Sequence, residues 1–117
     1  MKRALLIATA LILASCKINV DGILENQEPI NIIIYGAGTS TQEYVLFKTD
    51  QKYKQFKSWV ANNKDGWETT PASYVPSVIV KGSGFTFNFL NEGVIVNVDG
   101  KQYSKAVNKS EYDYLLQ

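Results

Sequence analysis

The stretch "FTFNFLNEGVIVNVDGKQYSKAV", residues 85–107, decides the fold, because apolar and polar residues alternate in it over three short segments. Asp99-Gly100 separates the last two segments, and both residues tolerate the positive φ that a two-residue hairpin turn requires. The alternation predicts two apolar rows on one face of a sheet, where they are expected to form the core. These rows are Phe85, Phe87 and Phe89, and Val94, Val96 and Val98.

Three other segments have the composition of strands. Residues 30–36 and 77–81 are short and rich in β-branched residues, and residues 42–48 alternate between polar and apolar positions. Short connections between strands imply antiparallel neighbours, since parallel strands need a long crossover. The sequence therefore predicts an antiparallel meander sheet of about five to six strands.

Residues 49–63 interrupt the strand pattern with a helical period. Thr49 or Asp50 is expected to cap the first turn by accepting a backbone N–H, and Gly66 is expected to end the helix. The apolar face of this main helix is expected to comprise Tyr53, Phe56 and Val60, with Trp59 beside it. This face should pack on the apolar rows of the sheet.

The order of these segments defines the expected architecture. A short C-terminal helix is predicted over residues 110–116, with Ser110 as its cap, and residues 68–76, which contain two Pro residues, are expected to form a loop. The fold class is therefore α+β, an antiparallel sheet with one main helix packed on one face. Residues 30–117 are long enough for one domain and too short for two.

The first sixteen residues, "MKRALLIATALILASC", have the pattern of a secretory signal. Lys2 and Arg3 precede an apolar run over residues 4–13 that is broken only by Thr9, and small residues follow the run. A helix that spans a membrane needs roughly 20 apolar residues, so this run is too short. The alternative, a buried first helix of the fold, is disfavoured because the run has no polar face.

The end of this signal, Leu13-Ala14-Ser15-Cys16, resembles the lipobox of bacterial lipoproteins at all four positions. The resemblance implies cleavage before Cys16, a lipid on its thiol and an acylated new N-terminus. Cys16 is also the single Cys of the chain, so it has no disulfide partner within the chain. Residues 1–15 are therefore interpreted as a signal peptide and residues 16–29 as a lipidated tether. This tether is expected to be partly ordered and to dock on the domain, and Asp21-Gly22 would allow a small hairpin in it.

A lipid anchor would place the domain at a bacterial membrane, facing the periplasm. Lys17 stands where lipoproteins of the inner membrane tend to carry Asp, so the resemblance favours the outer membrane. Removal of Lys2 and Arg3 leaves ten Lys against eleven acidic residues, a formal charge of −1. Without Arg or a basic stripe, the mature chain is not expected to bind nucleic acid.

Catalysis would have to proceed without His, which the chain lacks, and without a thiol once Cys16 is acylated. Asp65 and Glu68 flank Trp67 and could form the carboxylate pair of a glycosidase, but acidic residues are also common in turns and caps. The chain is therefore not expected to be an enzyme. No metal and no cofactor is expected other than the covalent lipid on Cys16.

The aromatic residues near the helix end and the proline loop are the candidate binding site. They are predicted to form a face that contacts another protein, because Trp and Tyr give large contact areas at recognition surfaces. The residues of this predicted face are Trp59, Asp65, Trp67 and Tyr74. The alternative is that Trp59 and Trp67 fill the core where the helix meets the sheet.

These features favour a membrane-anchored protein-binding module of the bacterial cell envelope. Residues 84–98 and the proline loop also resemble small bacterial envelope and immunity-type proteins, which implies inhibition of a toxin or hydrolase. The alternative function is a structural accessory lipoprotein of an envelope or secretion assembly, and a cell-wall-active enzyme is the least favoured. The expected partners are the lipid bilayer, through the anchor, and another protein.

Overall fold

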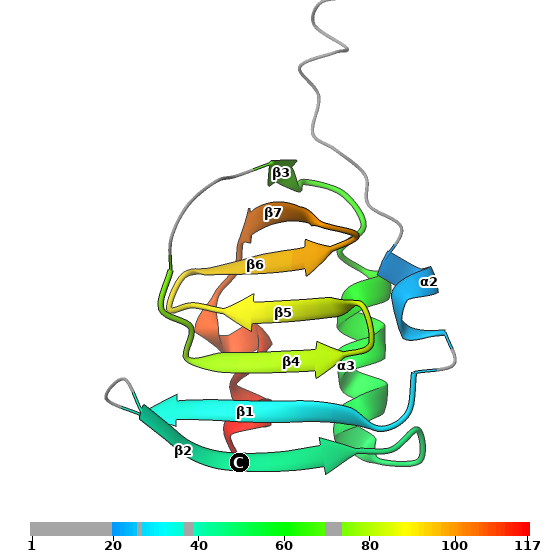
Figure 1. Cartoon of the computed structure of the whole chain (residues 1–117), viewed down its shortest axis with the longest axis vertical. Helices are drawn as coiled ribbons and strands as arrows, with labels where there is room; N and C mark the ends of the chain where they lie inside the picture. The colour runs from blue at the N-terminus through cyan, green and yellow to red at the C-terminus, as the bar shows by residue number, and fades with distance from the viewer. Residues whose placement is uncertain (1–19, 26, 37–38, 70–73) are drawn as a thin grey trace, which may run out of the picture.

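The structure is a computed structural model that describes residues 20–25, 27–36, 39–69 and 74–117. The predicted signal peptide, residues 1–15, and the predicted lipidation site, Cys16, lie outside the described residues. In the part of the chain that is described, the central element is one antiparallel sheet (Figure 1).

Seven strands form the sheet in the spatial order β2-β1-β4-β5-β6-β7-β3, and every neighbouring pair is antiparallel. The strands are β1 (Ile30–Gly36), β2 (Thr39–Leu46), β3 (Glu68–Thr69), β4 (Val78–Gly82), β5 (Phe85–Phe89), β6 (Gly93–Val98) and β7 (Lys101–Ala106). The predicted α+β class and antiparallel sheet are confirmed, although the sheet has seven strands. The additional strand, β3, has two residues and lies in the segment that was expected to be a loop.

Strands β4 to β7 form a meander, as predicted. In its last hairpin Val98 pairs with Lys101, and the two residues between them, Asp99 and Gly100, have φ values of 52° and 74°. A turn with two left-handed residues matches the right-handed twist of the strands that it joins. The hairpin predicted at Asp99-Gly100 is therefore confirmed.

The meander does not extend over the whole sheet. After β2, helix α3 (Gln51–Ala61) carries the chain behind the sheet to its far edge, where β3 pairs with β7 (Figure 1). The chain then returns to the middle of the sheet, and β4 pairs with β1. The order of strands in space thus departs from their order in the sequence because the helix crosses the sheet.

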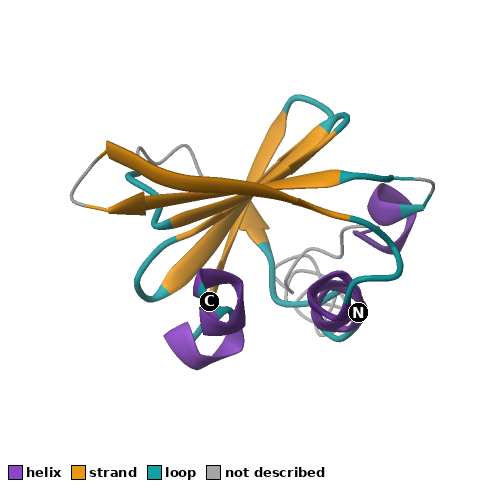
Figure 2. Cartoon of the chain, turned by 90° about the horizontal axis from the view of Figure 1, so that it is seen from below, coloured by secondary structure: helices purple, strands orange, loops and turns teal. Residues whose placement is uncertain are grey.

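One face of the sheet packs against α3 and two 3-10 helices, η1 (Lys109–Glu111) and η2 (Asp113–Leu116), and we call it the covered face (Figure 2). The ring of Phe56 in α3 meets the ring of Phe87 edge-on, with 5.2 Å between centroids. This geometry brings the positive edge of one ring to the negative face of the other. The buried strand residues of the covered face are Ile30, Ile32, Ile34, Leu46, Val78, Val80, Phe85, Phe87, Phe89, Val94 and Val96.

The ends of α3 differ in detail from the predicted caps. Asp50 occupies the N-cap position, but its carboxylate accepts the N–H of Phe47 (2.7 Å) and makes no capping bond to the helix. The helix ends at Ala61 with Asn62 as its C-cap, four residues before the predicted Gly66. Gly66 has a φ of 87° and turns the chain in the loop that follows.

The predicted C-terminal helix consists of the two 3-10 helices, and its first cap is Asn108 rather than Ser110. The carboxylate of Glu111 accepts the N–H of Asn108 (2.9 Å). Tyr112 and Leu115, three residues apart, are both buried against the sheet. Residues of this spacing lie on the same side in 3-10 and in α-helical geometry, so both side chains can face the sheet.

The predicted tether contains helix α2 (Val20–Leu24) in place of the hairpin that its Asp-Gly dipeptide allowed. Leu24 is 3% exposed and belongs to the hydrophobic core. The hydroxyl of Tyr53 donates a hydrogen bond to the carbonyl oxygen of Gln27 (2.7 Å). The packed domain therefore begins before residue 30, where the sequence analysis placed its boundary.

Candidate binding surface

The second face of the sheet carries no helix of the described chain, and we call it the open face (Figures 1 and 2). It consists of the strand residues that alternate with those of the covered face, since neighbours along a strand point to opposite sides. The pairing register arranges these residues in two rows across the strands. The first row is Glu43, Ile33, Ile79, Asn88, Ile95 and Ser104, and the second is Val45, Asn31, Lys81, Thr86, Asn97 and Gln102.

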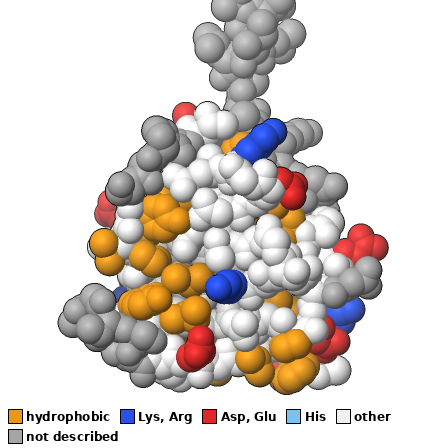
Figure 3. Space-filling model, viewed as in Figure 1, with side chains coloured by type: hydrophobic (Ala, Val, Ile, Leu, Met, Phe, Trp, Pro, Cys, Tyr) orange, Lys and Arg blue, Asp and Glu red, His pale blue; other side chains and the backbone are white. Residues whose placement is uncertain are grey.

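The first row has two neighbouring apolar residues on β1 and β4. Ile33 and Ile79 lie directly opposite each other, and both are partly exposed. Asn88, the next residue in the row, is 4% exposed, and its Nδ2 donates a hydrogen bond to the carbonyl oxygen of Ile95 (3.0 Å). Figure 3 shows hydrophobic side chains gathered over the β1, β2 and β4 side of this face. We call the pair Ile33 and Ile79 the apolar patch.

The second row offers hydrogen-bonding groups beside the apolar patch. The side-chain amide of Asn97 donates to Thr86 Oγ1 (3.4 Å) and to the hydroxyl of Tyr74 (2.8 Å). Tyr74 therefore lies against the open face, where it is half-buried. Apolar side chains with polar groups beside them are typical of protein-binding surfaces.

Strand β2 is one edge of the sheet and has eight residues, whereas β3 at the opposite edge has two. Alternate backbone N–H and C=O groups of an edge strand point away from the sheet and can pair with another chain. Val45 in β2 is 44% exposed, and Phe47 just beyond it is 46% exposed. The edge thus adds apolar contact area beside the open face.

The structure corrects the predicted aromatic face. Trp67 is 0% exposed, and its Nε1 donates a hydrogen bond to the carbonyl oxygen of Asn63 (2.6 Å). The ring of Trp59 is partly buried against Trp67 at 6.4 Å between centroids, and its Nε1 donates to Glu111 Oε1 (3.0 Å). A ring without exposed surface cannot touch a partner. The prediction of Trp67 as a binding residue is therefore wrong, and the alternative that it fills the core is confirmed.

The other two predicted residues lie apart from each other. Asp65 is exposed in the loop after α3, and its carbonyl oxygen accepts a hydrogen bond from Lys105 Nζ (2.6 Å). The same Nζ lies 5.8 Å from the ring centroid of Trp67, a favourable position for a cation over a π system. Tyr74 contacts Asn97 on the open face. The sheet thus separates Tyr74 from the two Trp side chains, and the four predicted residues do not form one surface.

Sequence reasoning misses the apolar patch. Residues 30–36 read as a nearly continuous apolar run, which is typical of a strand that is buried on both faces. The structure covers this strand with helices on one face only. The sequence did contain a signal for the patch. Ile33 in β1 and Ile79 in β4 are apolar residues at outward positions, where strict alternation would place polar residues.

Tyrosine hydroxyls on the covered side hold the fold together. Tyr44 donates a hydrogen bond to the carbonyl oxygen of Leu115 (2.5 Å), and Tyr112 donates to that of Leu90 (2.6 Å). Burial raises the pKa of both hydroxyls above the ordinary 10.0. Burial, followed by the charge of Tyr44, also raises the pKa of Tyr114. These groups keep their protons at neutral pH, so they act there as hydrogen-bond donors rather than as bases.

No helix among the described residues is long and apolar enough to cross a membrane. Within the same residues, no group of three His, Cys, Asp or Glu side chains gathers as it would around a metal ion. Comparison of the chain with protein-family models, with curated proteins and with solved structures gives no match in any of the three. The function is therefore argued from the residues and surfaces of the chain itself.

Proposed function

We propose that the chain is a lipid-anchored protein of the bacterial cell envelope that binds another protein through the open face. The anchor is an acylated Cys16, formed after cleavage of residues 1–15, and its support is the resemblance of the signal to a lipobox. Several acyl chains hold a protein firmly at a bilayer, at ~0.8 kcal/mol per buried methylene. Lys17 favours the outer membrane, with the domain in the periplasm.

The observation that carries the binding role is the apolar patch on a sheet face that no described helix covers. Ile33 and Ile79 are partly exposed on β1 and β4 of that face, toward the β2 edge, while α3, η1 and η2 all lie on the other side (Figure 2). Apolar side chains grouped on a surface and bordered by amides mark sites of contact with other proteins. In this proposal the module binds its partner without catalysing a reaction, and it needs no cofactor beyond its lipid.

The occupant that we propose is one protein of the periplasm, such as a toxin or hydrolase, which the module inhibits. The long edge of β2 lies beside the apolar patch, so a partner that covers the patch could also pair with the edge. A structural role within a larger envelope assembly is the alternative. The two functions differ in the partner: the first predicts one protein bound at about 1:1, and the second predicts a membrane complex.

A photo-cross-linking amino acid in place of Ile79, in the lipidated chain in cells, tests the proposal. We expect one protein to be cross-linked from this position and none from Gln55, an exposed position on α3 that serves as the control. With the captured protein purified, Ile79→Glu should weaken binding about a hundredfold, because a carboxylate would be desolvated in an apolar contact. Gln55→Glu should leave the affinity unchanged.

Three outcomes would contradict parts of this proposal. Cross-linking from position 55 but not from position 79 would remove the open face as the site. Capture of a multi-protein membrane complex in detergent would favour the accessory role. An intact chain with an unmodified Cys16, found by mass spectrometry, would remove the anchor.

A further inference from the structure

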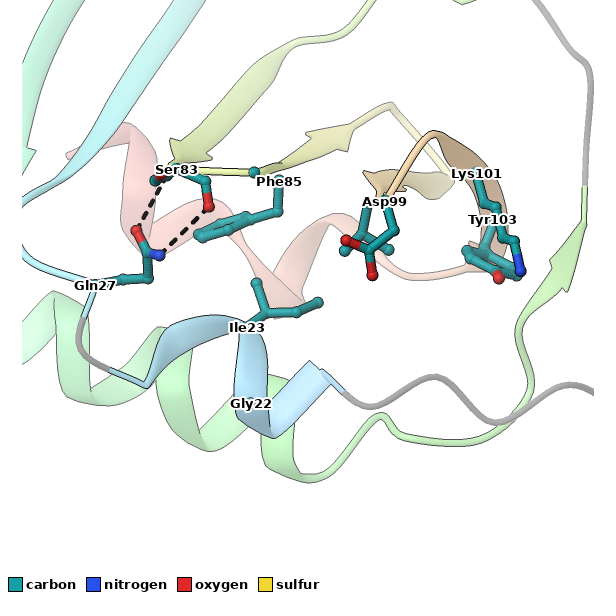
Figure 4. Close-up of a pocket in the computed structure, with 10 residues that line it drawn as sticks. Gly22, Ile23, Gln27, Ser83, Phe85, Asp99, Lys101 and Tyr103 are labelled. Carbon is teal, nitrogen blue, oxygen red and sulfur yellow. Dashed lines mark hydrogen bonds between the residues drawn. The ribbon is translucent and has the colours of Figure 1, made fainter.

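A cavity of about 540 Å³ lies between α2 and the turns at the ends of the β4–β5 and β6–β7 hairpins. Its apolar lining comes from Ile23, Phe85 and Val98, and its polar lining includes Asp99, Lys101 and Tyr103. Figure 4 shows Asp99 between Phe85 and Tyr103, with Lys101 alongside Tyr103 and Ile23 facing them from α2. The volume falls within the range of small-molecule sites, roughly 300–1,000 Å³.

The tether forms one wall of this cavity and is fastened in place. Gln27 makes two hydrogen bonds to the backbone of Ser83, because its Oε1 accepts the N–H (3.0 Å) and its Nε2 donates to the carbonyl oxygen (3.3 Å). Leu24 at the end of α2 is buried in the core. The wall is therefore held by contacts on both sides, and the cavity exists before any ligand enters.

The position of the cavity along the chain brings it close to the bilayer, a step that depends on the lipid anchor of the proposed function. Helix α2 begins at Val20, four residues after Cys16. Four residues span at most about 14 Å when fully extended. The headgroup layer itself is roughly 5–7 Å thick on each side of the hydrocarbon core. Lipid headgroups are consequently the molecules that this cavity meets at the highest local concentration.

The charges at the cavity match one class of headgroup. Asp99 and Lys101 carry opposite charges and line the same space, and the hydroxyl of Tyr103 lies beside them. A carboxylate binds an ammonium group, and a Lys ammonium binds a phosphate as a point charge. We propose that this cavity binds the headgroup of a glycerophospholipid that carries a phosphate and a primary amine, and so orients the domain on its own membrane.

In this arrangement Asp99 holds the amine and Lys101 holds the phosphate. Phe85 and Val98 form an apolar floor against the carbon atoms of the headgroup. The domain then stands with α2 and the two hairpin turns toward the bilayer. The open face lies to the side of this end of the molecule, so a partner can reach it (Figure 1).

The test uses the full lipidated chain in detergent micelles, titrated with the water-soluble probe glycerophosphoethanolamine and followed by NMR. We expect saturable shifts of the backbone amides of Ser83, Gly84 and Lys101. Asp99→Asn should bind this probe about tenfold more weakly, the effect of losing one charge-assisted hydrogen bond. This variant retains the turn because Asn, like Asp, tolerates positive φ.

Matched controls separate recognition from general charge effects. Asp113→Asn and Lys109→Gln alter exposed residues of the C-terminal turns and should leave the affinity unchanged. Lys101→Gln should weaken binding of both glycerophosphoethanolamine and glycerophosphoglycerol. Equal affinity of the original chain for these two probes would overturn the proposal, because the amine would then contribute nothing. Absence of saturable shifts at the cavity would overturn it as well.

Experiments in nanodiscs show whether the ligand of the cavity is a membrane lipid or a soluble phosphate compound. In nanodiscs of phosphatidylethanolamine the full chain should show the same shifts, and in nanodiscs of phosphatidylglycerol alone the shifts should be smaller, because only the phosphate contact to Lys101 remains. Shifts produced by the soluble probe but not by either nanodisc would overturn the assignment to a lipid. Acylation of Cys16 is measured by mass spectrometry, and the affinity for a partner protein at Ile79 is measured in a separate experiment. Failure of the proposed function can therefore be distinguished from failure of the headgroup site.

Discussion

Strand β5 shows the two faces of the sheet in three consecutive residues. Phe87 is fully buried beneath α3, whereas Thr86 and Asn88 on either side of it belong to the open face. Aromatic rings pack together on the covered face. On the open face, amide and hydroxyl groups form hydrogen bonds in the row that contains Thr86. The difference teaches that the ring packing on one side contributes most to holding the domain together, while the other side contributes less and can also serve recognition.

The largest expected effect tests the covered face directly. Phe87→Ala removes a fully buried ring and should lower the free energy of unfolding by about 3–5 kcal/mol, the cost of a large cavity. Thr86→Ala, one position along on the open face, should lower it by only about 1 kcal/mol, because it loses a long hydrogen bond from Asn97 and a β-branched side chain. Urea denaturation of both variants measures the contrast. Similar losses for the two variants would mean that the open face also contributes to the core.

High pH should weaken the covered face through its tyrosines. Burial raises the pKa of Tyr44, Tyr53 and Tyr112 in the folded state, whereas unfolded tyrosines titrate near 10.0. The unfolded state therefore releases protons first, and the stabilisation is present in full below pH 10.0 and is lost as the pH rises through the folded-state pKa values. Denaturant midpoints measured from neutral to alkaline pH should be constant and then fall.

A variant sharpens this alkaline prediction. Burial, followed by the charge of Tyr44, raises the pKa of Tyr114. Tyr114→Phe removes this ionisable group, so the decline above pH 10.0 should become shallower than in the original chain. A midpoint that is constant up to about pH 12 in the original chain would show that these hydroxyls are not protected by burial.

A smaller effect is expected from Asn88, a buried polar residue of the open face that links β5 to β6 by a hydrogen bond. Asn88→Leu keeps the branched shape and the number of side-chain heavy atoms but removes the hydrogen bond to the carbonyl oxygen of Ile95, so it should cost about 1 kcal/mol. Urea denaturation at neutral pH measures the loss. A cost as large as that of Phe87→Ala would show that the two faces do not differ in the way proposed.

The sequence was a good guide where the deciding interactions are local. The hairpin at Asp99-Gly100 depends on the φ values of two adjacent residues, and the buried face of α3 depends on spacing along one helix. Both were predicted correctly. The helix caps were less predictable, because Asp50 had a competing N–H close by, that of Phe47, and bound it instead.

The candidate site was harder to predict because it depends on contacts between distant segments. Trp is a residue type that is common at recognition surfaces, and only the packing of α3 and Lys105 around Trp67 shows that this side chain belongs to the core. Ile is a residue type that is common in cores, and only the absence of a described helix above Ile33 shows that this side chain lies on a surface. Residue type alone gives the same signal in both cases, since an apolar side chain favours burial by its own fold or by a partner.

The sequence by itself determined the class of the fold and the positions of the meander strands and main helix, and it predicts a lipid anchor at Cys16. These follow from periodicity, turn chemistry and a short motif, which act within a few residues. The tertiary structure alone decided the pairing of β1 with β4, the burial of Trp67 and the cavity beside α2. Each of these joins segments far apart in the chain, and the side on which α3 packs selects the face of the sheet that remains open.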